Sequence, residues 1–362
     1  MRRLPELEDN VPLAPLTTLG VGGPARHLAR PRTPEELRGV LAWAGERGLP
    51  FFILGQGSNV VFADEGFPGL VVQVDIAGAS WCPQGERVRV RAGAGQGWDG
   101  LVAEAVARDL SGIECLSGIP GRVGAAPIQN IGAYGQELSQ RLVRVEALDA
   151  RTLEEVALDS AGCGFGYRSS RFKTDEAARR LVVTYVEIEL GLHGRPEIRY
   201  EELARHLARQ ALKQPGPAQV RSAVLELRRA KSMVVDAADP LSRSAGSFFL
   251  NPLLSAAQRS AAEQRAHSSG ALPAGASLPG FAESDGTFKV PAAWLIEHAG
   301  YPRGYRRGAV GLSARHALAI VNHGGAKAAE IVALAREVRE GVRQRLGISL
   351  TPEPVLVGLS ID

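Results

Sequence analysis

The residues best suited to chemistry lie in one glycine-rich run, 117–135, which reads SGIPGRVGAAPIQNIGAYG. It holds five glycines, two prolines and a single charged residue, Arg122. Such a run makes neither a solvated linker nor a stable helix, because its backbone N–H groups must find partners other than side chains. Successive main-chain N–H groups in side-chain-poor loops commonly hold phosphates. The run therefore predicts contact with a large phosphate-bearing ligand; the alternative is a tight structural turn between two strands.

A second loop of this kind, 55–59, reads GQGSN and follows an expected buried strand at 50–54. Two glycines with short polar side chains at a strand-to-loop junction predict a second phosphate cradle. A third glycine cluster, 93–97, follows an expected strand at 87–93 and superficially resembles a dinucleotide fingerprint. Its glycine spacing is wrong, and no regular repeat of strand and helix follows it. We therefore predict no Rossmann domain.

The elements that must position these loops follow from hydrophobic periodicity. A helix is expected over 33–48, where Thr33, Pro34 and Glu36 supply an N-cap, a first-turn proline and a capping-box acid. Residues 141–190 are rich in strand patterns. A short strand is expected before helical sequence over 196–230, in which Tyr200 stands at the start of a helix over 201–209. A domain boundary is expected near 231–240. Beyond it we expect a small-residue loop at 266–280, a helix around 291–299 and a long amphipathic helix over 326–346.

Composition fits a cytoplasmic enzyme of two or three domains. The chain has 362 residues and a formal net charge of +3 from 42 basic and 39 acidic side chains, so it carries no strong global field and nucleic acid is not implied. Its three cysteines, Cys82, Cys115 and Cys163, lack metal-ligand spacing, which predicts neither a disulfide framework nor a metal site. No apolar run approaches the roughly 18 residues of a membrane-spanning helix, and the sequence MRRLPELEDN does not resemble a signal peptide.

Seven motifs in a fixed order together resemble one family, the UDP-N-acetylenolpyruvoylglucosamine reductases, also called UDP-N-acetylmuramate dehydrogenases. The motifs are TLGVGGPA at 18–25, GQGSN at 55–59, SGIPGRVGAAPIQNIGAYGQE at 117–137, YRSSRFK at 167–173, AGSFFLNP at 245–252, AWLIEHAG at 293–300 and PEPV at 352–355. The resemblance spans nearly the whole chain. It implies a flavoenzyme of peptidoglycan precursor synthesis that uses NADPH to reduce the enolpyruvyl ether of UDP-N-acetylglucosamine enolpyruvate to UDP-N-acetylmuramate.

The resemblance also implies an α+β fold with a two-lobed FAD-binding region of the vanillyl-alcohol-oxidase-like type and a C-terminal α+β substrate domain. On this basis we expect lobe 1 at 1–70, with the tail 357–362 packed on it, lobe 2 at 71–230, and the substrate domain at 231–356. A monomer is expected, with small-molecule substrates and with neither a metal nor a membrane as partner.

Three residues match the catalytic positions of the family. Arg168 and Glu353 would stabilise the enolate that develops beside the substrate carboxylate, since a guanidinium can grip a carboxylate with two hydrogen bonds. The prolines on either side of Glu353 restrict the backbone and so aim its carboxyl group. Ser247 would donate the proton, although a serine hydroxyl is a weak acid and the sequence discloses no group that would resupply it.

The remaining site residues follow from the same resemblance. Tyr200 matches a tyrosine found in one of the two subtypes of the family, where its hydroxyl binds the substrate diphosphate, and Lys231 is the expected cationic partner of that diphosphate. Tyr167 and Asn251 are also expected to contact substrate. The FAD-binding residues are expected to be Gly55, Gln56, Gly57, Ser58, Asn59, Ser117, Gly118, Ile119, Pro120, Gly121, Gly124, Ala125, Gln129, Asn130, Ile131, Gly132, Ala133 and Tyr134.

FAD is expected to bind without a covalent bond, because His27 and Cys115 are the only histidine or cysteine near these loops and neither lies in an attachment motif. Two alternatives stay open at this point. An FAD-dependent sugar or alcohol oxidase would share the two glycine-rich loops but would not need Ser247 and Glu353. A non-catalytic nucleotide-sugar binding protein would carry no flavin.

Overall fold

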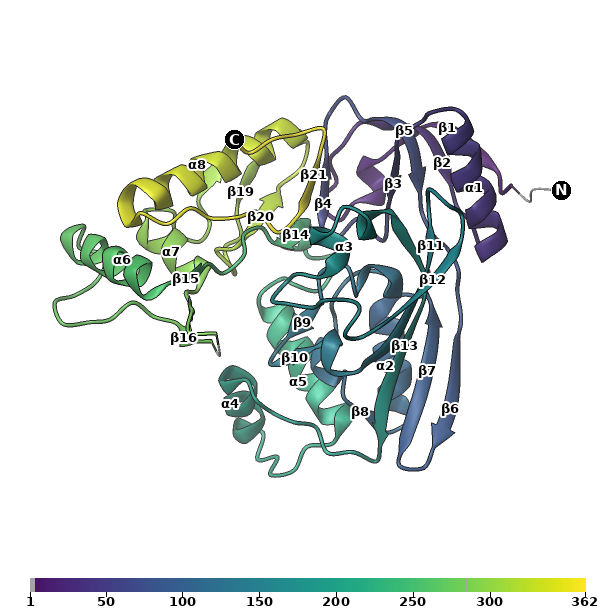
Figure 1. The fold of residues 1–362 in the computed structure, drawn as a ribbon. Coiled ribbons are helices and arrows are strands. Elements are labelled where there is room, and N and C mark those ends of the chain that lie inside the picture. Colours follow the sequence, from purple (N-terminus) through teal and green to yellow (C-terminus); the bar gives the residue numbers. More distant parts are fainter. Residues whose placement is uncertain (1–3, 284) are drawn as a thin grey trace. The chain divides into compact units, whose positions relative to one another are not determined.

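The computed structural model describes residues 4–283 and 285–362 (Figure 1). They form two compact units, each described here by itself. Of the described residues, unit 1 contains 4–11, 25–56 and 68–234, and unit 2 contains 12–24, 57–67, 235–283 and 285–362. Segments 12–24 and 57–67, which the sequence analysis assigned to lobe 1, thus belong to the same unit as the C-terminal part of the chain.

Unit 1 begins with a four-stranded sheet in the order β1-β2-β5-β3, formed by Leu7–Pro12, Pro24–Ala29, Phe67–Val72 and Phe51–Ile53. β3 and β5 run parallel. Helix α1 (Pro34–Glu46) follows β2 in the chain. It begins where the sequence predicts, with the Thr33 hydroxyl accepting from the N–H of Glu36. The Glu36 carboxylate accepts the N–H of Arg32 at 2.8 Å. In a capping box it would accept the N–H of the N-cap residue, Thr33, so the observed contact lies one residue earlier in the chain.

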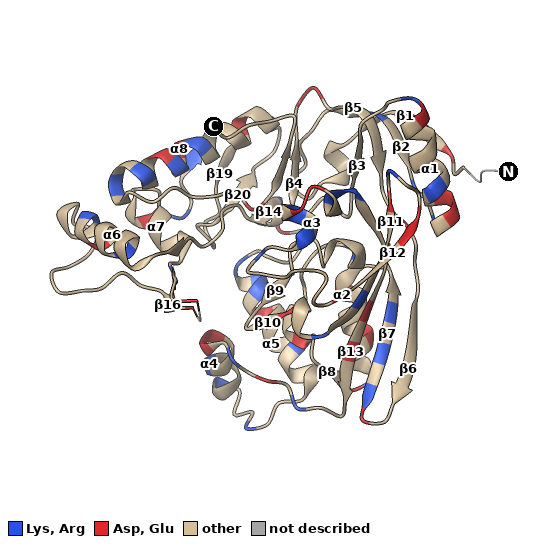
Figure 2. Ribbon diagram, viewed as in Figure 1, with Lys and Arg blue, Asp and Glu red and all other residues tan. Residues whose placement is uncertain are grey.

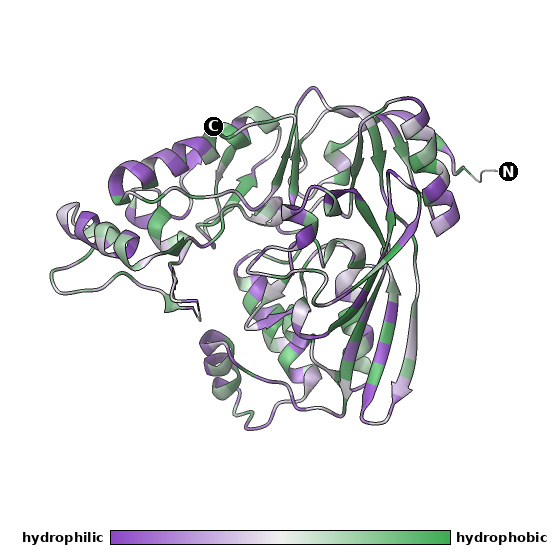
Figure 3. Cartoon of the chain, in the orientation of Figure 1, coloured by the Kyte–Doolittle hydropathy of each residue, from purple (hydrophilic) through white to green (hydrophobic). Residues whose placement is uncertain are grey.

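A second, six-stranded sheet forms the larger part of unit 1. Its order is β12-β11-β13-β7-β6, with β8 pairing β13; the strands are Glu155–Asp159, Leu142–Asp149, Leu181–Leu192, Arg87–Gly93, Ala79–Gln84 and Leu110–Ser111. Along β7 hydrophobic and hydrophilic residues alternate (Figure 3), and the basic members form the blue bands of Figure 2. The buried face of this alternation joins a core that runs through both sheets of the unit.

The helices of unit 1 are α2 (Trp98–Ala107), α3 (Arg171–Thr174), α4 (Glu201–Arg209) and α5 (Pro217–Ala230), and a two-stranded ribbon is formed by β9 (Gly132–Ala133) and β10 (Gln136–Glu137). A small cluster of Leu203, Leu207, Val220, Ala223 and Val224 packs α4 and α5 together around the buried Cys115. This packing places the N-terminus of α4 and the C-terminus of α5 near the glycine-rich run, since Tyr134 also contacts the cluster.

Unit 2 contains three small sheets. Their orders are β14-β20-β19-β18 (Ser244–Ser247, Ala319–Asn322, Val310–Leu312, Arg306–Arg307), β15-β17-β16 (Leu253–Leu254, Phe288–Lys289, Phe281–Ala282) and the parallel pair β21-β4 (Val355–Val357, Val60–Phe62). Its helices are α6 (Ala256–Ser268), α7 (Ala292–His298) and α8 (Ala328–Leu346). The apolar face of α8 contributes Ile331, Leu334, Val338 and Val342 to one buried core.

The structure corrects two sequence expectations. The short strand expected before Tyr200 is not formed, because residues 194–200 run without regular structure. The small-residue composition predicts a loop from 266, yet α6 continues to Ser268, and its start was not predicted. A reciprocal capping box between Ser255 and Gln258 explains this helix, because it satisfies the first orphan N–H groups of a segment whose apolar periodicity is weak.

Candidate functional site

The glycine-rich run meets the first half of GQGSN within unit 1. The Gln56 carboxamide oxygen accepts the N–H of Gly121 at 2.9 Å. Further along, the N–H of Val123 donates to Gln96 O at 2.8 Å and that of Gly124 to Ala94 O at 2.9 Å. These N–H groups are therefore used to hold the loop itself, and backbone contacts to a ligand must come from other members of the run.

Packing explains two of the glycines in the run. A Cβ on Gly124 would lie 2.6 Å from the Cβ of Ala94, so this position must lack a side chain for the loop to lie against the strand end. Gly118 has φ +70°, and its Cβ would meet the side chain of Leu225 at 2.9 Å. The structural-turn alternative accounts for these two positions, and the run is both a packed element and a candidate ligand loop.

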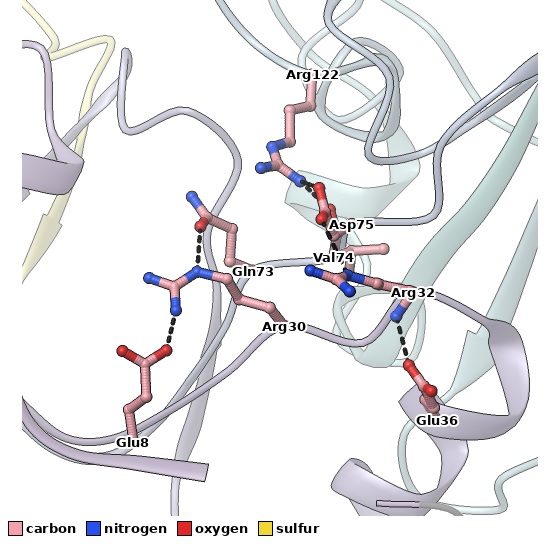
Figure 4. Close-up of polar contacts among 8 residues, drawn as sticks. All are labelled: Glu8, Arg30, Arg32, Glu36, Gln73, Val74, Asp75 and Arg122. Atoms are coloured by element: carbon pink, nitrogen blue, oxygen red, sulfur yellow. Dashed lines mark hydrogen bonds and ion pairs between the residues drawn. The ribbon is translucent and has the colours of Figure 1, made fainter. Parts of the chain in front are cut away.

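A chain of polar contacts holds Gly55, and Figure 4 shows the part of it that links Gln73, Arg30 and Glu8. The Gln73 amide donates to Gly55 O at 2.9 Å, and its oxygen accepts from Arg30 Nε at 3.2 Å. The Arg30 guanidinium in turn pairs with Glu8 of β1. Gln73 is buried, so its amide fixes the position of Gly55 in a place that water does not reach freely.

Arg122, the one charged residue of the glycine-rich run, anchors that run in the same region of Figure 4. Its guanidinium donates to the carbonyl of Val74 and lies 2.9 Å from Asp75 Oδ1. Residues 73–75 thus hold Gly55 from one side and Arg122 from the other. Both loops that sequence analysis singled out are positioned by one short segment after β5.

A partly exposed ion pair ties the beginning of the run to two helices. Asp99, in the first turn of α2, accepts the N–H of Gly118 at 2.6 Å. It also receives two hydrogen bonds from Arg221 of α5, at 2.6 and 2.9 Å. Burial alone would raise the pKa of Asp99, but the hydrogen bonds from Arg221 and Gly118 hold that pKa below its ordinary value of 3.8.

Asp99→Asn is expected to loosen this tether. An asparagine amide presents a donor to the Arg221 guanidinium, so the variant should hold the glycine-rich run less firmly and melt at a lower temperature, by the modest amount expected for a partly exposed pair. Because the folded-state pKa is depressed, the contribution of the carboxylate is present above the unfolded value of 3.8 and is lost as pH falls through the folded pKa. The difference in melting temperature between wild type and variant should therefore be full at neutral pH and shrink in acid.

Thermal melting from neutral to acid pH, followed by circular dichroism, measures this difference. Glu104→Gln is the matched control, since Glu104 lies on the same helix and pairs with Arg108 at the surface. A melting difference between wild type and Asp99→Asn that is unchanged below pH 3.8 would contradict the assignment.

Arg228 of α5 is a buried cation with an unsatisfied donor. Its Nη2 donates to Met233 O at 2.8 Å, but its buried Nε has no hydrogen-bond partner among the described residues. Burial lowers the pKa of Arg228, and charge interactions with Tyr134 and Asp99 oppose that effect. A Cβ on Gly118 would lie 3.2 Å from this Nε, so the unsatisfied donor faces the glycine-rich run. Such a group fits an anionic ligand held by the run.

Arg168 lies directly against the same run. It adopts φ +50°, which is uncommon for a residue with a side chain, and its guanidinium donates to the carbonyls of Asn130 and Gly132. A Cβ on Gly132 would come within 2.9 Å of Arg168 Nη1, so glycine is needed for the guanidinium to lie there. Tyr167 precedes it, with its ring 5.7 Å from the Arg168 guanidinium carbon.

The residues expected to bind a diphosphate form a group of their own in unit 1. Lys231, just after α5, pairs with Glu202 of α4 at 2.6 Å and lies 6.0 Å from the Tyr134 ring centroid. The Tyr134 and Tyr200 rings meet edge to face at 5.5 Å. Burial raises the pKa of Tyr134 to about 12. Two aromatic rings, a cation and a carboxylate therefore meet beside the end of the glycine-rich run.

In unit 2 the second half of GQGSN contacts the PEPV motif. The Asn59 amide donates to Glu353 O at 3.4 Å, and the N–H of Val355 donates to Asn59 O at 3.0 Å. Thr18 contacts both Gly57 and the β14 strand, with its hydroxyl 2.7 Å from Ser244 O and its N–H 3.0 Å from Gly57 O.

Ser247 and Glu353 lie on neighbouring segments of unit 2. The N–H of Glu353 donates to Phe248 O at 2.9 Å, and Phe248 directly follows Ser247. Asn251 lies a few residues further and uses its side-chain oxygen to accept the N–H of Ala292 at 2.8 Å, which caps α7. The Ser247 hydroxyl lies 3.4 Å from His316 Nε2, a contact that sequence analysis missed.

The structure thus groups the expected residues by unit. Unit 1 contains Gly55, Gln56, the run 117–135, Tyr167, Arg168, Tyr200 and Lys231; unit 2 contains Gly57, Ser58, Asn59, Ser247, Asn251 and Glu353. Residues that sequence analysis missed include Arg228, Glu202 and His316. Arg228 carried a signal, the basic stretch RRAK before the predicted boundary, whereas the other two are recognisable only by their spatial partners.

Comparison with known proteins identifies the family. A model of the UDP-N-acetylenolpyruvoylglucosamine reductase C-terminal domain matches residues 238–357, and a model described as an FAD binding domain matches residues 25–152. A reductase of that name from Thermobifida fusca is 49% identical over 355 residues, which is 97% of this chain and 98% of the relative. The chain belongs to the UDP-N-acetylenolpyruvoylglucosamine reductase family.

Two further members of the reductase family are similar to this chain over most of its length. The reductase of Cutibacterium acnes is 43% identical over 98% of this chain and 91% of its own length. The crystal structure of the reductase from Thermus caldophilus is similar with a TM-score of 0.63 and 28% identity, covering 97% of this chain and 98% of that one. The predicted fold class, an α+β chain with an FAD-binding region and a C-terminal domain, is thereby confirmed.

Two further observations concern the described residues alone. None of their helices has the length and apolar character needed to cross a bilayer. Within 4–283 and 285–362, histidine, cysteine and acidic side chains do not gather into a group of three that could ligate a metal.

Proposed function

We propose that the chain is an NADPH-dependent flavoenzyme that reduces the enolpyruvyl ether of UDP-N-acetylglucosamine enolpyruvate to UDP-N-acetylmuramate, a step of peptidoglycan precursor synthesis. The observation that carries this is membership of the reductase family, with relatives at 42–49% identity over nearly the whole chain. We propose that it acts as a monomer in the cytoplasm, with two FAD-binding lobes at 1–70 and 71–230 and a substrate domain at 231–356.

The residues of the glycine-rich run fit FAD. The cofactor carries a pyrophosphate, and the run lies beside the buried Arg228, whose Nε has no partner. Bound FAD would supply the hydride transfer between NADPH and the enolpyruvyl carbon distal to the ether oxygen. Gln56 and Asp99 hold the run through Gly121 and Gly118, so their role is to shape the loop.

The chemistry of Cys115, which lies two residues before the glycine-rich run, supports FAD that binds without a covalent bond. Burial raises the pKa of the Cys115 thiol to about 12, so at neutral pH this group is not the thiolate that would attack a flavin. Cys115 is fully buried beneath α4 and α5. His27 is engaged with Asp9 at 2.6 Å and packs against Trp43.

Three residues are proposed to act on the enolpyruvyl group. Arg168 would hold the substrate carboxylate and stabilise negative charge as it develops, because a guanidinium can grip a carboxylate with two hydrogen bonds. Glu353 would assist this stabilisation. Ser247 would donate a proton to the carbon that bears the ether oxygen.

The diphosphate of the substrate is proposed to bind at Tyr200 and Lys231, with Tyr167 and Asn251 as further contacts. Lys231 is held by Glu202 at 2.6 Å, and both side chains are about one-third exposed. A diphosphate that takes Lys231 as its partner must therefore compete with the carboxylate.

Glu202→Gln is expected to remove this competition. The amide cannot form an ion pair, so the KM for the nucleotide sugar should fall by about 2- to 5-fold, the range of a partly exposed salt bridge, with kcat little changed. Lys231→Ala should raise the same KM. Glu226→Gln serves as the control, since Glu226 pairs with His206 on the neighbouring helix. An unchanged KM in Glu202→Gln, measured at low and at high salt, would rule out the competition.

The proposed function is tested anaerobically. The purified protein is reduced with NADPH, the enolpyruvyl nucleotide sugar is added, and the flavin absorbance is followed. Rapid return of the oxidised band together with formation of the lactyl ether is the expected result. Reduced flavin that is not reoxidised by the sugar nucleotide, and is reoxidised only in air, would instead support an oxidase. A colourless protein that binds no FAD would support a nucleotide-sugar binding protein.

A further inference from the structure

The side chains of Ser247 and His316 meet in unit 2, with Oγ and Nε2 3.4 Å apart. Strand pairing builds this contact. Ser247 is the last residue of β14 and is paired with Ala319, the first residue of β20. His316 lies in the turn that leads into β20, where its carbonyl accepts the N–H of Ala319 at 3.0 Å.

The backbone around Ser247 fixes the direction of its hydroxyl. The pairing of β14 with β20 shifts register between Ser244 and Ser247, and Gly246 within that irregularity has φ +72°. On the other side, the N–H of Phe248 donates to Leu318 O at 2.7 Å. Bulges of this kind re-aim the side chain that follows them, and here the hydroxyl faces the imidazole.

Arg315, the charged residue next to His316, forms an ion pair with Asp239. Arg315 Nη1 lies 3.2 Å from Asp239 Oδ2, at the start of the segment that leads to β14. The imidazole is an ionisable group in contact with the Ser247 hydroxyl. Although 3.4 Å is long for such a hydrogen bond, catalytic hydrogen bonds often shorten in the complex with substrate.

We propose that His316 resupplies the proton that Ser247 gives to the substrate. This rests on the proposed function, in which hydride reaches one carbon of the double bond and a proton must reach the other. The serine O–H bond breaks as the new C–H bond forms at the ether-bearing carbon. The N–H bond of the imidazolium breaks as the serine O–H bond is restored, and the neutral imidazole then takes a proton from water. Neither residue is oxidised or reduced.

The relay explains how a serine hydroxyl can donate a proton at neutral pH. An isolated serine that gives up its proton becomes an alkoxide, which is far too basic to form at neutral pH without a donor at hand. Histidine is the side chain whose ordinary pKa lies near neutrality, so it can give and regain a proton under these conditions.

A double-mutant cycle over Ser247 and His316 tests the relay. Pre-reduced protein is mixed with the enolpyruvyl sugar nucleotide, and flavin reoxidation is followed in a single turnover. His316→Ala should slow this step by at least about 10-fold, less than loss of the serine because water can partly replace the imidazole. Reduction by NADPH should be unchanged. In the Ser247→Ala background the histidine substitution should add nothing, since its effect passes through the serine.

Two further measurements separate proton supply from a structural role. Added imidazole should restore part of the rate of His316→Ala and none of the rate of Ser247→Ala. His316→Asn keeps a polar side chain of similar reach but cannot be protonated, so it should be as slow as the alanine variant and decides the matter if His316→Ala fails to fold. His267→Ala, which removes an exposed histidine of α6 in the same unit, should keep the wild-type rate.

Several results would overturn the relay. They are a wild-type rate in His316→Asn, equal slowing of both half-reactions, or additive losses in the double variant. A wild-type protein that is not reoxidised by the sugar nucleotide at all would instead overturn the proposed function, and the two failures are therefore distinguishable.

Discussion

Ser247→Ala is expected to slow reoxidation of the reduced flavin by the enolpyruvyl nucleotide sugar by about 10²-fold or more, the scale of general acid catalysis. Reduction of the flavin by NADPH should continue at nearly the wild-type rate, because that half-reaction transfers hydride without needing the serine proton. The substitution removes only one oxygen from a β-strand end whose backbone contacts run through Ala319 and Leu318, so the fold should be kept.

Stopped-flow measurement of each half-reaction checks this result. Ser244→Ala is not a suitable control because its carbonyl and hydroxyl take part in the strand end. Ser260→Ala on α6 is better matched, since it removes a hydroxyl elsewhere in unit 2. Equal slowing of the two half-reactions would remove Ser247 from the role of proton donor.

Arg168→Lys is expected to lower the rate of the same half-reaction by roughly 10²- to 10³-fold, the scale of losing one donor to a developing anion. Lysine keeps the positive charge but lacks the planar fork that can hold a carboxylate with two hydrogen bonds. It also cannot reproduce the pair of contacts to the carbonyls of Asn130 and Gly132. The KM for the sugar nucleotide should rise as well, because the same fork binds the ground-state carboxylate.

Arg171→Lys is the matched control, because Arg171 lies nearby on α3 and pairs with Asp175 at 3.0 Å. Flavin absorbance per protein reports whether the run 130–132 still holds its cofactor in each variant. Wild-type kinetics in Arg168→Lys would show that a point charge suffices and that the bidentate grip is not used.

The two ligand loops could be predicted from sequence because backbone-binding segments have a local composition. A lack of charge and an excess of glycine are visible in the 19 residues of 117–135 without knowledge of their neighbours. Which glycine serves which purpose could not be predicted, since the demand on Gly124 comes from Ala94 and that on Gly132 from Arg168. The count of glycines indicated a ligand, whereas the structure assigns part of that count to packing.

Two contacts that sequence analysis missed join residues that are far apart along the chain. His316 is 69 residues from Ser247, and Asp99 is 122 residues from Arg221. No local pattern marks such partners, because each is an ordinary polar residue until the strands or helices pair. Secondary structure was predictable where apolar periodicity was strong, as in α8, and failed at α6, where capping rather than periodicity defines the helix.

The pairing of β4 with β21 has a consequence for how the chain is made. Val60 pairs with Val355, so the partner strand of an early segment is synthesised 295 residues later. At ordinary ribosomal speeds of about 5 to 20 residues per second, the segment after Gly57 waits on the order of 15 to 60 seconds before it can pair. During that time an apolar strand, Val60–Phe62, has an open edge, which invites pairing with other chains. Nascent chains that stall before residue 355 should therefore be clients of cellular chaperones, whereas unit 1 can form most of its contacts once residue 234 has emerged.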